Sequence, residues 1–488
     1  MPTNVKKKAV SATLWSVVRI GVDQVFSFVV FVVIARLLGP VEVGLFSLGM
    51  IVAELGRIFA TSGFSDAVTK AGEDDEEIVS RVAFWGNMGM AVACAALITL
   101  FARPISWLMA TDRLEGVLIA LAWTLPISAG GAVHMARQLR RFGHKTLAIR
   151  SIIAGLVGSA AAVWAAYHDF GVYALVIQRF ITELVTMLTA WFAFRWWPSV
   201  NFTRAQLIEV LPFSVSMSVS KLIGVIISRV QDMIIGVFVG AASVGFYRVA
   251  RRTIDMLSIG TLTPISTVSV NLFVAIREDQ TKVKQTFIRL LSVAGALSFP
   301  AFFGLAAIAK DLVTILYGAR WLEVVPMMQA LSLFCIPSLI SLLFLPILTS
   351  FGQSKKALHF TTIQFFVTII FALVAAPFGL WPIILSLLAR GYVMIPYQIR
   401  LIEPHTQCSL SEVGLAILRP LISALIMALA CYTLGEYMLA PVQNVALRLV
   451  VTVSAGAVMY VALLFLTDRQ SISWLIQLAR SRSESVIK

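Results

Sequence analysis

Fourteen long apolar runs follow one another along this 488-residue sequence, and they restrict what the chain can fold into more than any other feature. A helix needs about 20 mainly apolar residues to cross a bilayer. The runs are centred near Phe26, Val52, Ala91, Trp123, Leu156, Val185, Val225, Ile259, Gly295, Phe334, Val367, Leu388, Ile426 and Ala457. They predict an all-α polytopic membrane protein with 14 transmembrane helices.

The composition supports this fold class. Hydrophobic residues make up 59% of the chain and charged residues only 13%, whereas a soluble globular protein has roughly 45–50% apolar and about 25% charged residues. A soluble enzyme, a disordered chain and a secreted disulfide scaffold are therefore excluded. The four cysteines, Cys94, Cys335, Cys408 and Cys431, lack the CxxC spacing of metal or redox sites.

The distribution of Lys and Arg predicts the orientation in the membrane. With the N-terminus inside, the cytoplasmic segments carry 21 of these residues, and the opposite side carries only Arg36, Arg103, Arg113, Lys310 and Arg320. Because cytoplasmic loops are enriched in Lys and Arg, we expect both termini in the cytoplasm. The basic loops thus indicate topology and not nucleic-acid binding. The acidic run at residues 73–77 is expected to be a solvated loop before the third helix.

Four short motifs recur in the same order at intervals of 201 to 209 residues. The pairs are Gly39–Phe46 with Gly240–Tyr247, Ala102–Ile105 with Ala309–Leu312, Phe142–Gly143 with Phe351–Gly352, and Phe170–Tyr173 with Phe378–Trp381. Each copy holds six predicted helices, and an even number gives parallel repeats around an axis along the membrane normal. The repeat predicts two six-helix lobes, 1–205 and 206–410, around a central cavity. Residues 411–488 add two transmembrane helices and a basic tail.

Polar and charged residues concentrate in four of the predicted helices, the first two of each repeat. They are Ser16, Arg19, Asp23 and Ser27 in the first; Glu54 and Arg57 in the second; Ser214, Ser218, Lys221, Ser228 and Asp232 in the seventh; and Arg248, Arg251, Arg252 and Asp255 in the eighth. A charge at a helix centre costs about 2.5–3.5 kcal/mol on insertion scales, so such residues face a cavity or a partner. These helices are therefore expected to line the central cavity.

Mutual neutralisation is the alternative for single pairs. Arg19 and Asp23, Glu54 and Arg57, and Arg251 and Asp255 stand three or four residues apart, the spacing of helical ion pairs. With Arg229 included, however, seven cations stand against four carboxylates, and Arg179 and Arg390 occupy the last helix of each repeat. Glu183 can neutralise Arg179. An excess of buried cations favours an anionic ligand, and Arg suits phosphate oxygens.

The chain carries no motif for catalysis. A Gly-rich phosphate loop, a nucleophile elbow and an HExxH motif are all missing from the sequence. The loops between the spans are too short for a folded catalytic domain. We therefore expect a protein that is not an enzyme and that needs no cofactor or metal, apart from a coupling proton or sodium ion.

Several motifs give the sequence a family resemblance. They are Ile34–Pro40 with Gly44–Phe46, Arg140–Phe142 with Gly171–Gln178, Asp232–Tyr247, and Tyr317–Trp321. They resemble the polysaccharide transporter family, the Wzx-type flippases of the multidrug/oligosaccharidyl-lipid/polysaccharide superfamily. The resemblance implies two six-helix lobes plus two trailing helices. It also implies translocation of undecaprenyl-diphosphate-linked oligosaccharide to the periplasmic leaflet of the bacterial inner membrane, for exopolysaccharide, capsule or O-antigen synthesis.

Combined with the polar helices, this resemblance gives a hypothesis for the binding site. The cargo would cross the membrane by alternating access. Arg19, Lys221, Arg248, Arg251 and Arg252 would hold the diphosphate, and Ser214, Ser218 and Ser228 the sugar hydroxyls. Asp23, Glu54, Asp232 and Asp255 would modulate these cations or bind the coupling ion. The expected partners are the lipid-linked oligosaccharide, the bilayer, and polymerase or export components.

Three other functions remain as alternatives. A cation-coupled multidrug exporter of the same superfamily needs an acidic, aromatic cavity, whereas the buried charge here leans basic. A membrane-embedded glycan polymerase or ligase needs a large outer loop. A non-transporting scaffold does not need polar stripes inside the membrane.

Overall fold

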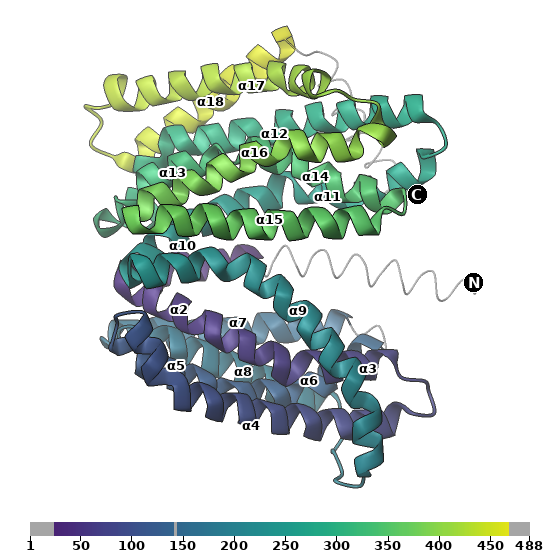
Figure 1. Cartoon of the computed structure of the whole chain (residues 1–488). Helices are drawn as coiled ribbons and strands as arrows, with labels where there is room; N and C mark the ends of the chain where they lie inside the picture. Colours follow the sequence, from purple (N-terminus) through teal and green to yellow (C-terminus); the bar gives the residue numbers. More distant parts are fainter. Residues whose placement is uncertain (1–23, 141–143, 468–488) are drawn as a thin grey trace. The chain divides into compact units, whose positions relative to one another are not determined.

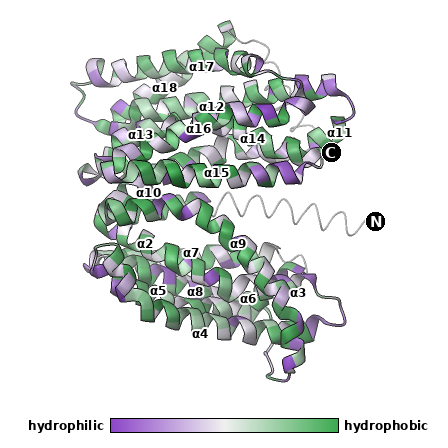
Figure 2. Cartoon of the chain, viewed as in Figure 1, coloured by the Kyte–Doolittle hydropathy of each residue, from purple (hydrophilic) through white to green (hydrophobic). Residues whose placement is uncertain are grey.

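We describe residues 24–140 and 144–467 of a computed structural model (Figure 1). All regular secondary structure in these ranges is helical, which confirms the predicted all-α class. The chain forms two compact units, Met1–Arg248 and Val249–Lys488. Figure 2 shows apolar residues along the helices and polar residues mainly at the helix ends and in the loops.

The described helices agree with the predicted spans. Eleven are long and apolar enough to cross a membrane, and the number rises to 13 when each of two bent pairs counts as one span. The helix Gln24–Leu37 is the described part of the first run. The 14 predicted helices are compatible with this count. The predicted centres Trp123 and Phe334 fall where a span is interrupted, between α5 and α6 and between α13 and α14.

The first unit contains the helix Gln24–Leu37 and the following elements. They are α2 (Pro40–Arg57), the π-helix η1 (Ile58–Ser62), α3 (Gly63–Lys70), α4 (Glu76–Leu108), α5 (Arg113–Ala122), α6 (Thr124–Arg140), α7 (His144–Tyr167), α8 (Tyr173–Ala193), α9 (Arg204–Phe238) and the start of α10 (Ala241–Thr261). A capping box begins α9. The backbone N–H of Gln206 donates to the Thr203 hydroxyl, and the backbone N–H of Thr203 donates to the side-chain oxygen of Gln206.

The second unit continues from α10. Its elements are α11 (Thr263–Ile276), α12 (Gln280–Leu316), the 3₁₀-helix η2 (Ala319–Trp321), α13 (Val324–Ser332), α14 (Cys335–Ser350), α15 (Ser354–Ala375), the 3₁₀-helix η3 (Ala376–Phe378), α16 (Leu380–Thr406), α17 (Leu410–Thr433), the π-helix η4 (Leu434–Met438) and α18 (Val445–Thr467). The trailing helices α17 and α18 both pack on α12. Ion pairs reinforce that packing: Lys284 with Glu412, Lys310 with Glu436, and Arg448 with Asp311.

Irregularities of the helices recur at the interval of the sequence repeat. The π-helix η1 interrupts the second span at Ile58–Ser62, and the bend between α10 and α11 falls at Leu262. Gly171 and Gly379, which match in the fourth motif pair, both have positive φ angles, +55° and +98°. Glycine adopts that conformation without steric cost, which explains why both copies carry it. These shared breaks support the internal duplication.

The compact units divide at a different position from the predicted lobes. The helix α9 packs on α2, η1, α3 and α4, so the first unit includes residues 206–248. The predicted boundary at 205/206 instead follows the duplication in the sequence. It stays a prediction about the repeat, whereas the boundary at Arg248 describes packing.

The starts of α2 and α10 form a reciprocal contact within the first unit. A Cβ atom on Gly44 would lie 1.7 Å from the Ala241 carbonyl oxygen, and one on Gly245 would lie 2.0 Å from the Pro40 carbonyl oxygen. Gly44 and Gly245 match in the repeat, as do Pro40 and Ala241. Two equivalent segments thus touch through the same surface, as in a contact about a two-fold axis.

Candidate functional site: a charge network in the first unit

A network of charged side chains joins three membrane helices of the first unit. Its members are Glu54 and Arg57 on α2, Arg229 and Asp232 on α9, and Arg248 on α10. Three cations share two carboxylates, so the network carries one net positive charge. Each member lies inside an apolar helix, where an unpaired charge is costly.

Arg229 is the central residue of this network. Its Nη2 lies 3.0 Å from Glu54 Oε2, and its Nε donates to the same oxygen at 3.1 Å. Its Nη1 lies 3.7 Å from Asp232 Oδ2. The guanidinium therefore bridges a carboxylate of its own helix and one on α2. Its side chain remains 26% exposed, so it is accessible to a ligand.

Asp232 and Glu54 each hold a second cation. Arg248 Nη1 lies 3.3 Å from Asp232 Oδ2, and Arg57 Nη2 lies 4.0 Å from Glu54 Oε1. Asp232 is nearly buried, with 5% of its side chain exposed, whereas Arg57 is 41% exposed. Asp232 is thus the enclosed member of the network and Arg57 its most accessible one, whereas Glu54, Arg229 and Arg248 are similarly half-buried. This arrangement can present positive charge to an anion.

A second ion pair lies close to this network. Arg179 and Glu183 pair along α8, as their spacing predicts. Arg179 also interacts electrostatically with Arg57 and Glu54. The pair adds no net charge, which agrees with the sequence-based interpretation that Glu183 neutralises Arg179.

Lys221, predicted to bind the diphosphate, has a partner that the sequence analysis missed. Its Nζ lies 2.5 Å from Asp66 Oδ2 on α3. The helical spacing within α9 gives no indication of this pair, because Asp66 comes from a different helix. The pair is neutral, so Lys221 adds nothing to the positive charge of the network.

The predicted serine stripe on α9 does not lie in one environment. Ser214 is buried where α9 crosses α3, and a Cβ atom on Gly63 would lie 1.9 Å from the Ser214 carbonyl oxygen. Ser218 is also buried, and its hydroxyl lies 3.5 Å from the Ile58 carbonyl oxygen. Only Ser228 is exposed, and it donates to the Val225 carbonyl oxygen. Helix packing therefore covers Ser214 and Ser218 in this structure, and the predicted contacts of the three hydroxyls with sugar stay a prediction.

In the second unit, two cations lie over one aromatic ring. The guanidinium carbons of Arg251 and Arg390 lie 6.0 and 5.8 Å from the centre of the Phe334 ring. Arg251 pairs with Asp255 at 3.0 Å, which is the neutralised pair that the sequence allowed. Arg390 donates to the Thr368 hydroxyl at 2.9 Å. The Phe334 ring thus holds both guanidinium groups in place, and Asp255 neutralises the charge of Arg251.

Of the remaining residues predicted for the site, the structure describes Arg252 but not those of the first predicted helix. Arg252 follows Arg251 on α10, and it interacts electrostatically with Tyr317. Ser16, Arg19 and Asp23 lie outside the described residues, so their roles stay predictions. Arg229, the centre of the network, is one of the helix cations in the sequence but does not belong to the predicted binding set. Among the described residues, no group of three or more His, Cys, Asp or Glu side chains is placed to hold a metal ion.

The acidic run is only partly a solvated loop. Glu76 and Glu77 start α4 and pair with Arg137 of α6, whose nitrogens lie 3.0 Å from each carboxylate. Arg137 also lies over the Trp196 ring, at 4.8 Å from its centre, and the Trp196 indole donates to Glu77. The expectation of a solvated loop is wrong for these two residues, because α6 supplies a buried cation opposite them.

Replacing Arg137 by Gln is expected to destabilise the protein. Only 8% of the Arg137 side chain is exposed, and loss of one partner of a buried ion pair costs about 3–5 kcal/mol. The matched control is Arg140→Gln, because Arg140 lies farther from Glu76, at 3.7 Å, and is more exposed. Thermal unfolding of both purified variants measures the difference. An equal fall in the two melting temperatures would contradict the assignment of Arg137 as the main contact.

A protein-family model described as "Polysaccharide biosynthesis protein" matches residues 33–326. The succinoglycan biosynthesis transport protein ExoT of Rhizobium meliloti is 25% identical over 485 residues, covering 99% of this chain and 98% of that protein. The lipopolysaccharide biosynthesis protein WzxC of Escherichia coli is 20% identical and covers 67% of each chain. These matches confirm the resemblance inferred from the sequence motifs.

Solved structures show the same fold. The lipid II flippase MurJ, in an inward closed conformation, matches with a TM-score of 0.73 at 13% identity and covers 94% of this chain and 100% of that one. An inward-facing multidrug resistance transporter of the MATE family matches with a TM-score of 0.58 at 16% identity, covering 81% of this chain and 99% of that one. At these identities the likeness concerns the fold alone.

Proposed function

We propose, from the premise that this chain belongs to the polysaccharide biosynthesis protein family, that it moves lipid-linked oligosaccharide units across the bacterial inner membrane. The cargo would be an undecaprenyl-diphosphate-linked glycan carried from the cytoplasmic to the periplasmic leaflet. The relative named as a succinoglycan biosynthesis transport protein supports transport over catalysis.

The observation that carries this proposal is the network around Arg229. Three guanidinium groups converge on two carboxylates within apolar helices, and these five described residues together carry one excess positive charge. Arg forms paired hydrogen bonds with phosphate oxygens, and these bonds are stronger where water is scarce. A diphosphate is the anion that fits such a site on a membrane-soluble cargo. A cationic drug would meet the same excess of positive charge and be repelled.

The carboxylates give the site a way to release its cargo. Glu54 and Asp232 hold the guanidinium groups when no anion is bound. An entering diphosphate competes with them, and its departure lets the pairs form again. This exchange limits net affinity, because the anion replaces contacts that the protein already makes. Moderate affinity suits a transporter, which has to release what it binds.

In this proposal, alternating access opens the site first to one leaflet and then to the other. The polyprenyl tail stays in lipid while the head group crosses. A proton or sodium ion bound at Glu54, Asp232 or Asp255 can couple the cycle to the membrane potential, which supplies about 2.3 kcal/mol per charge per 100 mV. Both termini lie in the cytoplasm in this proposal. The cargo is released on the periplasmic side, where polymerase or export components receive it.

Deletion of the gene, followed by analysis of the lipid-linked oligosaccharides, tests the function. We expect complete oligosaccharide units to accumulate on the cytoplasmic leaflet, where an added impermeant glycosidase cannot reach them in intact spheroplasts. Accumulation on the outer leaflet would instead indicate a polymerase or ligase. Unchanged polysaccharide with increased drug sensitivity would indicate a multidrug exporter.

A further inference from the structure

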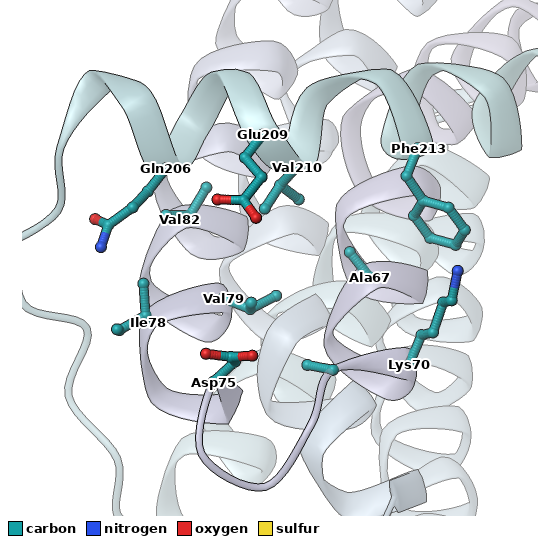
Figure 3. Close-up of a pocket in the computed structure, with 11 residues that line it drawn as sticks. Ala67, Lys70, Asp75, Ile78, Val79, Val82, Gln206, Glu209, Val210 and Phe213 are labelled. Carbon is teal, nitrogen blue, oxygen red and sulfur yellow. The ribbon is translucent and has the colours of Figure 1, made fainter.

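A groove lies at the ends of three helices of the first unit, away from the Arg229 network (Figure 3). It has a volume of about 340 Å³ and is formed by the end of α3, the start of α4 and the start of α9. Its floor is aliphatic, with Ala67, Val79, Val82 and Val210. Because these are ends of membrane helices, the groove lies at a membrane boundary.

Charged side chains of both signs stand around this apolar floor. Lys70 lies at one end, with its Nζ 4.6 Å from the centre of the Phe213 ring. Asp75 and Glu209 stand toward the other end, on opposite sides of the groove, as Figure 3 shows. Asp75 is the N-cap residue of α4, yet its side chain makes no capping hydrogen bond. In the described part of the chain, none of the three has an ion-pair partner.

Neighbouring charged residues outside the groove do have ion-pair partners. Asp66, Glu76 and Glu77, from the same stretch of chain, are all paired with cations. The groove keeps a cation and two carboxylates apart across an apolar surface. Such a surface is complementary to an amphiphile that carries both charges on one head group. It does not match an anionic lipid, because the two carboxylates repel a head group that has no cation.

We propose that this groove binds an aminophospholipid of the surrounding bilayer. The Lys70 ammonium holds the phosphodiester, the Asp75 and Glu209 carboxylates hold the primary ammonium, and the acyl chain lies along the aliphatic floor. Ion pairs at a membrane boundary are only partly screened by water. The bound lipid would tie α9 to α3 and α4 at their ends, independently of what the protein transports.

Lipid binding by the full-length protein in detergent tests this proposal, with native mass spectrometry as the readout. We expect dioleoylphosphatidylethanolamine to bind about fivefold more tightly than dioleoylphosphatidylglycerol, the effect of one ion pair of about 1 kcal/mol. The variant Asp75→Asn/Glu209→Gln should bind both lipids equally, and Lys70→Gln should weaken both. Phosphatidylcholine, which keeps the positive charge but has no N–H donor, should fall between the two.

Glu278→Gln serves as the matched control, because Glu278 is an exposed carboxylate before α12 and outside the groove. It should keep the full preference for phosphatidylethanolamine. Equal binding of the two lipids by the unmodified protein would overturn the proposal. So would a preference that survives in Asp75→Asn/Glu209→Gln.

Discussion

Replacing Arg229 by Gln is expected to reduce surface polysaccharide more than tenfold per molecule of protein in the membrane. The substitution removes the cation that bridges Glu54 and Asp232 and leaves the network without net charge. A neutral network has no excess charge to attract a diphosphate. Arg229→Lys keeps the charge but loses the planar fork, so we expect intermediate export. Polysaccharide measured in a deletion strain that carries each variant gives the comparison.

Two controls separate binding from folding. Arg277→Gln removes an exposed cation after α11 and should leave export unchanged. Glu54→Gln/Arg229→Gln removes both charges of the closest pair, so the protein should be more stable than Arg229→Gln alone. It keeps one net positive charge but lacks the guanidinium that forms paired hydrogen bonds with phosphate, so we expect export to stay low. Full export by this double variant would show that the pair only supports the fold. Normal export by Arg229→Gln at normal protein levels would contradict the cationic site itself.

Substitution of either Gly44 or Gly245 by Val is expected to abolish export and destabilise the protein. Each new side chain would overlap a backbone carbonyl group of the facing helix, with Cβ distances of 1.7 and 2.0 Å, so the helices must separate. Overpacking of this kind costs about 1–3 kcal/mol. Because the contact is reciprocal, the two variants should have similar effects on the melting temperature and on polysaccharide export.

Gly89→Val is the matched control for this pair. Gly89 lies inside α4, and a Cβ atom there would have no neighbour within 4 Å. It should therefore be tolerated. If either Gly44→Val or Gly245→Val were as stable and active as the control, the close approach of α2 and α10 would not exist in the functioning protein.

Much of the fold follows from local properties of the sequence. Apolar length predicts the spans, and the repeat predicts that breaks in one half recur in the other, as at η1 and Leu262. Pairs within one helix, such as Arg251 with Asp255 and Arg179 with Glu183, follow from spacing alone. The spacing of residues along one helix is fixed by the helical period, so these features need no tertiary information.

The candidate site was predictable in composition but not in its contacts. Arg229 and Glu54 are 175 residues apart, and nothing local indicates that they meet. Ser214 and Ser228 belong to one polar stripe, yet helix packing buries Ser214 and leaves Ser228 exposed. The ion pair of Lys221 with Asp66 also joins two different helices, so local spacing does not predict it.

The sequence by itself therefore determined which segments cross the membrane, which helices carry charge, and the sign of the excess. Those properties depend on apolar length, helical period and composition, which are local. Only the tertiary structure decided which charges neutralise one another and which remain available. Charge pairing between helices depends on how the helices rotate and cross. That geometry is set by side-chain packing along their whole length, as at Gly44 and Gly63.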